Sequence, residues 1–150
     1  MSIDRLNWKI LKCLQENSRM SNVEIGKRVG ISSPAVSERI KKMEDAEIIQ
    51  GYTAFVSPFK AGYQLKALIT MRAFMGMLKP FLEKVKTYSE VVNCYRITGN
   101  ENFVMEVVLK DQKHLEAFID QLIIYGETKT QIVLSHVVKH SEVKPLNEKY

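Results

Sequence analysis

Residues 32–42 bring together hydroxyl, carboxylate and cationic side chains, a combination that suits a nucleic acid. Serine hydroxyls can hydrogen-bond to phosphate oxygens or base edges, a glutamate can accept from N4 of cytosine, and lysine and arginine suit phosphate oxygens. The residues of this candidate surface are Ser32, Ser33, Pro34, Ser37, Glu38, Arg39, Lys41 and Lys42, with Lys27 and Arg28 shortly before them. The set favours double-stranded DNA as a partner.

The net charge of +5 is concentrated around the same residues. Residues 17–42 contain six lysines and arginines but only two carboxylates, Glu24 and Glu38. A polyanion is the natural partner of such a segment, although a run of charge by itself is more often a solvated face. The charge therefore needs support from the elements that carry it.

Short helices are predicted to position this surface. A first helix covers about residues 4–16, with Asp4 as its N-cap. A second helix begins after Ser21, which forms a capping box with Glu24, and it ends where Gly30 supplies a positive φ. A turn of about three residues then leads into the serine-rich stretch.

The third helix carries the candidate surface. Either serine of the pair at 32–33 is its N-cap, and Pro34 fits the first helical position because its missing N–H would be unpaired there. Val36, Ile40 and Met43 form an apolar stripe, so the polar residues face outward. Two helices joined by a glycine turn form a helix-turn-helix, whose second helix enters the major groove. The alternative is an ordinary helical hairpin with a solvated basic face.

The rest of the chain predicts the order βαββαβ. A β-rich hinge at 48–58 comes first. One helix has Pro80 in its first turn, and Asp111 caps the other. The predicted strands cover residues 65–73, 91–98, 103–110 and 130–138.

Helices on one side of such a sheet leave its other face uncovered. We assign the apolar alternation of Ile69, Met71 and Ala73 to that face, which then needs a partner, and we predict a homodimer. Trp8 and Leu11 lie off the main apolar stripe of the first helix. They form either a second packing contact or part of a dimer seam.

The stretch DRLNWKILKCLQENSRMSNVEIGKRVGISSPAVSERIKKMEDAEIIQGYTA, residues 4–54, resembles the DNA-binding half of the Lrp/AsnC family of leucine- and asparagine-responsive regulators. Looser similarity continues through EVVNCYRITGN (90–100) and TKTQIVL (128–134). The resemblance implies a transcription regulator of the α+β class that assembles into dimers, tetramers or octamers. Its N-terminal domain would be a winged or simple helix-turn-helix, followed by a hinge strand and a ferredoxin-like ligand-sensing and oligomerisation domain. The expected boundaries are 1–50, 51–63 for the hinge, 64–140, and 141–150 for an extended or partly ordered tail.

The resemblance also implies a small-molecule site at the interface between dimers, beside a loop of the form Gly-Asp-aromatic-Asp that holds small amino acids. Here the loop is GNEN, in which Asn100 and Asn102 replace the carboxylates and Glu101 replaces the aromatic residue. A neutral amide binds an α-ammonium group less strongly than a carboxylate does, which weakens the expectation of an ordinary amino-acid effector. The alternative is a plain hairpin turn. The candidate effector residues are Thr98, Gly99, Asn100, Glu101, Asn102, Thr128 and Thr130.

A second departure from the family lies at Glu47, where the family usually has glycine just past the recognition helix. If this residue adopts left-handed geometry, its side chain costs on the order of 1 kcal/mol. Either the helix ends differently or it is strained.

An enzyme is the main alternative of another class. Gly-rich phosphate loops and G-x-S-x-G are missing from the sequence, and its three histidines are scattered, so neither a catalytic site nor a metal or other cofactor is predicted. A segment like a signal peptide is missing too, and no apolar run approaches the roughly 20 residues of a membrane span, so a cytoplasmic location is expected. Two hypotheses remain for a DNA-binding protein: a regulator that senses a metabolite, and an architectural protein that wraps DNA without an effector.

Overall fold

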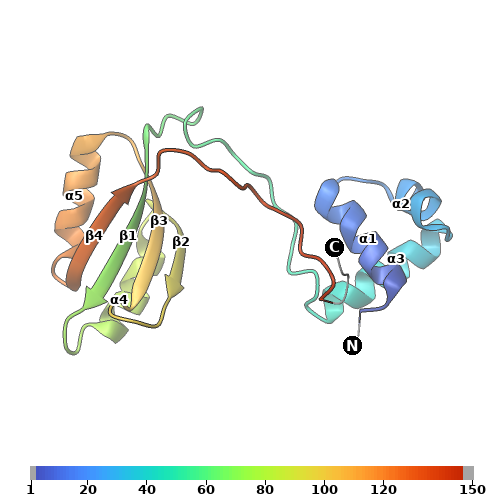
Figure 1. Cartoon of the computed structure of the whole chain (residues 1–150), viewed down its shortest axis with the longest axis horizontal. Coiled ribbons are helices and arrows are strands. Elements are labelled where there is room, and N and C mark those ends of the chain that lie inside the picture. Colours follow the sequence, from blue (N-terminus) through green and yellow to red (C-terminus); the bar gives the residue numbers. More distant parts are fainter. Residues whose placement is uncertain (1–2, 147–150) are drawn as a thin grey trace. The chain divides into compact units, whose positions relative to one another are not determined.

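The computed structural model describes residues 3–146 and divides into two compact units. One unit consists of Met1–Ala54 and Val138–Tyr150, and the other of Phe55–Val137. The first is helical, and the second combines a sheet with helices (Figure 1). The last four residues of the predicted tail, 147–150, lie outside the described residues. Within residues 3–146, no helix has the length and apolar character needed to cross a membrane.

The N-terminal unit contains α1 (Arg5–Glu16), α2 (Asn22–Val29) and α3 (Ser33–Asp45). Trp8 and Leu11 both pack with the core of this unit, which makes them packing contacts within one chain. The buried side chains of this core are Ile10, Leu11, Cys13, Met20, Ile25, Val36 and Met43.

Short polar side chains start the first two helices as predicted. Asp4 Oδ1 accepts from the N–H of Asn7 at 2.7 Å, and Ser21 Oγ accepts from the N–H of Glu24 at 3.2 Å. The Glu24 carboxylate pairs with Arg28 at 3.0 Å instead of returning to the N–H of Ser21. Only half of the predicted capping box therefore forms, because a cation one turn along the helix is the stronger partner.

The turn between α2 and α3 depends on two glycines. Gly30 has φ 81° as predicted, and its N–H donates to the carbonyl of Gly26 at 2.8 Å. A Cβ on Gly26 would lie 2.5 Å from the carbonyl oxygen of Ile31, so only glycine allows the turn to fold back on α2. Of the two candidate caps, Ser32 is the N-cap of α3, and its Oγ accepts from the N–H of Ala35 at 3.4 Å.

The tail returns to the N-terminal unit. Val143 donates its N–H to Gln15 Oε1 at 2.7 Å and accepts from Gln15 Nε2 at 3.1 Å. This reciprocal pair ties the tail to the last turn of α1.

The segment between the two units differs from the prediction of a β-rich hinge. Residues 51–57 form neither helix nor strand, and residues 58–62 form turns in which Tyr63 N–H donates to Pro58 O at 3.0 Å. A strand requires a regular ladder of backbone hydrogen bonds with a neighbouring strand, and residues 51–57 take part in no such ladder within the described range.

The C-terminal unit has the predicted order βαββαβ. Its four strands form an antiparallel sheet in the order β2-β3-β1-β4, which is ferredoxin-like. The helices pack on one face of the sheet (Figure 1). The elements are β1 (Leu65–Ala73), α4 (Leu78–Lys84) continued by the short 3₁₀ helix η1 (Val85–Thr87), β2 (Val91–Arg96), β3 (Phe103–Leu109), α5 (Gln112–Leu122) and β4 (Gly126–Ile132).

The assignment of Ile69, Met71 and Ala73 to an uncovered face is wrong. Ile69 and Met71 are fully buried in the core beneath the helices, and Ala73 packs against the same core. Strand residues alternate between faces, so the uncovered face carries the residues between them, such as Leu68 and Arg72. That face is mixed in character rather than apolar.

The predicted fourth strand at 130–138 is also misplaced. β4 begins four residues earlier, at Gly126, and ends at Ile132, which pairs with Ala67. β1 begins only two residues before Ala67, so the chain soon runs past the end of its partner strand; Val133 makes one more bond, to the carbonyl of Lys66 at 2.9 Å. Beyond it, Leu134 is 95% exposed.

The end of α3 confirms the left-handed geometry anticipated for Glu47, whose φ is 55°. The N–H of Glu47 donates to Glu44 O and that of Ile48 to Met43 O, both at 2.9 Å. These two bonds form a Schellman motif with glutamate at the position that favours glycine.

Glu47→Gly is therefore expected to raise the free energy of unfolding by about 1 kcal/mol, because glycine carries no Cβ penalty at positive φ. Ala46→Gly is the matched control: Ala46 has φ −89°, so glycine there adds only flexibility and lowers stability. Urea unfolding of both variants checks this, and an unchanged or lower stability of Glu47→Gly would contradict it.

Candidate nucleic-acid interface and effector loop

The outer side of α3 is set by what its inner side buries. Val36 and Met43 are fully buried against α1 and α2, and Ile40 packs beside them. Because an α-helix repeats every 3.6 residues, Ser37 and Lys41 lie on the opposite side, where both are exposed. The predicted orientation of the third helix is confirmed.

The first turn of α3 presents small groups. Ser32 and Pro34 are exposed and Ser33 is half-buried. The Ser32 oxygen already accepts the capping bond, which leaves its O–H free to donate. A thin first turn of this kind allows the backbone to approach a base edge or phosphate closely.

Glu38 follows one turn later and pairs with Lys42 at 2.6 Å. The hydrogen bond from Lys42 lowers the pKa of Glu38, so the side chain is a carboxylate that only accepts hydrogen bonds. An acceptor at this place suits the N4 amino group of cytosine and disfavours a phosphate.

The basic residues of the candidate surface divide into paired and unpaired cations. Arg28 lies between Glu16 at 3.2 Å and Glu24 at 3.0 Å, and Lys42 is held by Glu38. Arg39 pairs with Asp4 at 2.8 Å. Lys27 and Lys41 make no ion pair with any residue of the range 3–146, and both are exposed. These two lysines have the charge most available to a phosphate.

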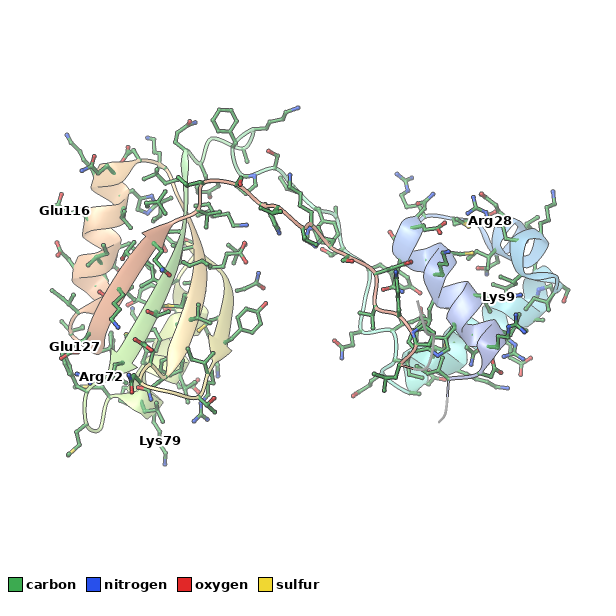
Figure 2. The ribbon with its side chains drawn as sticks, in the orientation of Figure 1. Lys9, Arg28, Arg72, Lys79, Glu116 and Glu127 are labelled. Atoms are coloured by element: carbon green, nitrogen blue, oxygen red, sulfur yellow. The ribbon has the colours of Figure 1, made fainter. Side chains whose placement is uncertain are left out.

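Three further cations were not included in the sequence-based surface. Arg5, Lys9 and Lys12 occupy positions i, i+4 and i+7 of α1, are exposed, and have no ion pair among residues 3–146 (Lys9 is labelled in Figure 2). Their helical spacing is visible in the sequence and could have identified them as one basic stripe.

The GNEN loop is a tight connection between β2 and β3. Ile97 N–H donates to Asn102 O at 2.9 Å, and Gly99 has φ 114°. Asn102 also ties the loop to the end of β1: its N–H donates to Met71 O at 2.8 Å, and its Oδ1 accepts from Ala73 N–H at 2.7 Å. The side-chain oxygen of Asn102 is therefore already engaged in holding the sheet together.

Glu101 points to the uncovered face of the sheet, where Lys129 binds it at 2.7 Å. That hydrogen bond lowers the pKa of Glu101 and keeps it ionised. Next to it on the same end, Arg72 of β1 pairs with Glu127 of β4 at 2.7 Å (Figure 2). Two ion pairs, Glu101–Lys129 and Arg72–Glu127, thus connect the loop and β1 to β4 at this end of the sheet.

The two threonines lie on the other face. Thr128 pairs with Met71 and Thr130 with Ile69 in the sheet register, so both side chains lie on the helix-covered side and are half-buried. The structure brings Asn102 and Thr128 to the same end of β1, whereas Thr130 lies further along. Thr98, Gly99 and Asn100 form the exposed tip of the loop. No grouping of histidine, cysteine and carboxylates across residues 3–146 is suited to a metal ion.

Two family models match the chain in succession. Residues 3–50 match the model described as winged helix-turn-helix DNA-binding, and residues 66–143, more than half of the chain, match the Lrp/AsnC ligand binding domain. The first match contains α1 to α3, and the second contains the sheet except for Leu65, the first residue of β1.

Relatives with the same organisation are found in several bacteria. An uncharacterised HTH-type transcriptional regulator of Bacillus subtilis, YezC, is 36% identical over 89% of this chain and 94% of its own length. The solved structure of the Neisseria meningitidis transcriptional regulator NMB0573 with L-Met has a TM-score of 0.88 and 29% identity, covering 97% of this chain and 98% of that one. The structure of Escherichia coli AsnC has a TM-score of 0.86 and 28% identity, covering 97% and 100%. With both halves matched in the same order along its length, the chain belongs to the Lrp/AsnC family of helix-turn-helix transcriptional regulators.

Proposed function

We propose that this regulator binds operator DNA by placing the N-terminal half of α3 in the major groove. The observation that carries the proposal is the division of α3 into a buried stripe, Val36 and Met43, and an exposed polar side that includes Ser37 and Lys41. It supports the groove-facing role because this side combines hydrogen-bonding groups with a free cation.

The polar residues take separate roles in this proposal. Ser33, Ser37 and Glu38 face base edges, where each good contact discriminates by about 1–3 kcal/mol. Lys27 and Lys41 meet phosphates, because their charges are not already paired. Arg28, Arg39 and Lys42 would each have to leave a carboxylate to do the same. Ser32 and Pro34, at the start of α3, let the helix backbone come close to the DNA.

We infer a homodimer formed through the uncovered face of the sheet. Leu68, 37% exposed, and Tyr95, 57% exposed, are apolar or aromatic side chains on that face. The face also carries the bridge between Lys66 and Glu106, so a second copy would meet a surface of mixed character. A two-fold dimer would place two α3 helices roughly one DNA turn apart, about 34 Å. From the resemblance to the family, we expect these dimers to assemble further into tetramers or octamers.

We propose a small amino acid or related metabolite as effector, bound in the C-terminal unit near the GNEN loop and Thr128. Support comes from the ligand-binding family model over residues 66–143 and from the Neisseria relative solved with L-Met. In this role Thr98, Gly99 and Asn100 at the loop tip offer hydroxyl, backbone and amide groups to the ligand, and Thr130 lies deeper along β4.

A specific observation favours a second candidate, an architectural protein that wraps DNA without an effector. Asn102 Oδ1 is already bonded to Ala73 N–H, and the Glu101 carboxylate is already paired with Lys129. The loop therefore offers no unpaired carboxylate to an α-ammonium group. Both candidates are non-enzymatic, and both act where chromosomal DNA is held, which we take to be the cytoplasm.

Lys41→Ala is expected to weaken binding to specific and random duplexes alike, because it removes a phosphate contact. The slope of log K against log salt should fall in magnitude by about 0.9, the value for one phosphate. Lys79→Ala is the matched control, since Lys79 is an exposed cation of α4 in the other unit. Fluorescence anisotropy across a salt series measures both, and an unaltered slope for Lys41→Ala would contradict the proposed interface.

A thermal-stability screen against the twenty amino acids and related metabolites separates the two candidate functions. A bound effector at 100 times its Kd stabilises by about 2.7 kcal/mol. We expect a selective shift from one small class of compounds. A flat response, together with intact DNA binding, would rule out the amino-acid effector and favour the architectural protein.

Variants of Asn102 test the structural role of the loop. Asn102→Ala removes the acceptor of Ala73 N–H and is expected to lower the free energy of unfolding by about 1–3 kcal/mol. Asn102→Asp retains an acceptor and adds a carboxylate, so we expect nearly unchanged stability and tighter binding of an amino acid found in the screen. If Asn102→Ala and the wild type unfold at the same urea concentration, the hydrogen bond from Ala73 N–H to Asn102 does not stabilise the fold.

A further inference from the structure

Arg39 reaches from the middle of α3 to the first turn of α1. Its Nη1 donates to Asp4 Oδ2 and to Asn7 Oδ1, both at 2.8 Å. Asp4 uses its other oxygen, Oδ1, to cap α1 through the N–H of Asn7. One guanidinium therefore binds the N-cap residue of α1 and a residue of its first turn, 35 and 32 positions away in the sequence.

Asn7 is an unusual residue for its place. Its side chain is 1% exposed, and its Nδ2 is buried without a hydrogen-bond partner among residues 3–146. A buried donor without a partner costs about 1–3 kcal/mol, so an apolar residue would serve the core better. What Asn7 supplies is an acceptor for Arg39 inside the helix interface.

Arg39 also lies in the less extensive of the two interfaces that α3 makes with α1 and α2. α3 packs more extensively on α2, through the tight glycine turn, than on α1. Within residues 3–146, the side-chain hydrogen bonds that join α3 to the start of α1 are those of Arg39. Its side chain is 34% exposed, compared with 60% for that of Lys42, which projects to solvent on the same helix.

We propose that Arg39 is a positioning residue that fixes α3 against α1 through Asp4 and Asn7, and that operator recognition depends on this clamp rather than on a contact between Arg39 and phosphate. The inference rests on the proposal that α3 is the groove-facing helix. A rotation of α3 would move the base-facing hydroxyls of Ser33 and Ser37 together, so loss of the clamp lowers affinity for the preferred sequence more than affinity for DNA in general.

The decisive variant is Asp4→Asn. Asparagine is as good an N-cap as aspartate, so α1 is retained, but the ion pair to Arg39 is lost. The probes are a duplex selected by the wild-type protein from a random library and a random-sequence duplex of equal length. We expect the full-length variant to bind the selected duplex roughly two- to fivefold more weakly, the scale on which a partly exposed ion pair acts.

The expected sign opposes simple electrostatics. Asp4→Asn removes a negative charge, and if Arg39 were a phosphate ligand the change would also release it, so either effect alone would tighten binding. Glu16→Gln is the matched control, because it makes the same change of charge and frees Arg28 from one carboxylate. This control is expected to bind the selected duplex at least as tightly as the wild type.

Arg39→Gln and Lys41→Ala complete the test through their salt dependence. A clamp predicts that Arg39→Gln weakens specific binding without changing the salt slope, and that combining it with Asp4→Asn adds little further loss. Undiminished affinity of Asp4→Asn for the selected duplex, or a slope reduced by about 0.9 in Arg39→Gln, would overturn the inference. If Lys41→Ala also leaves the slope unchanged, the groove-facing role of α3 fails instead, whatever Asp4→Asn does.

Discussion

The burial of Val36 and Met43 is the constraint on which the DNA-binding half depends. Two fully buried side chains, seven positions apart, leave α3 one rotational setting, and the polar side follows from it. The turn before α3 sets its direction, because Gly26 lets the carbonyl of Ile31 come closer than any side chain would allow. The core and the turn together decide which groups can reach a base.

Fewer cations of residues 17–42 are free to bind DNA than the sequence implies. A net charge of +5 concentrated near residues 17–42 looks like one basic patch, yet Arg28, Arg39 and Lys42 each lie against a carboxylate. Each of these three cations would have to leave its carboxylate to meet a phosphate, so the unpaired lysines Lys27 and Lys41 are the more available charges. Binding that relies on a few unpaired lysines is weaker in general and leaves more of the affinity to sequence-specific contacts.

Local signals in the sequence predicted local structure well. The caps at Asp4, Ser21 and Asp111, the glycine at 30 and the βαββαβ order all follow from patterns within a few residues. What failed depends on partners far away in the chain. The start of β4 is set by its register with β1, and the segment after residue 50 cannot be a strand without a neighbouring strand. Pairings such as Arg39 with Asp4 likewise join residues that no helical period connects.

The error over Ile69 and Met71 explains how the uncovered face differs from the core. In β1, the alternate apolar residues Ile69 and Met71 lie on the face that α4 and α5 of the same chain cover. The uncovered face instead mixes Leu68 with the Lys66–Glu106 and Arg72–Glu127 pairs, which suits the proposed dimer because such a face also stays soluble before assembly. In the same way, Asn102 can hold the end of β1 with a neutral oxygen as well as a carboxylate would. The charge of the GNEN loop is thus separable from its fold, so under the proposed effector role aspartate or asparagine at position 102 would change what the loop binds and leave the sheet intact.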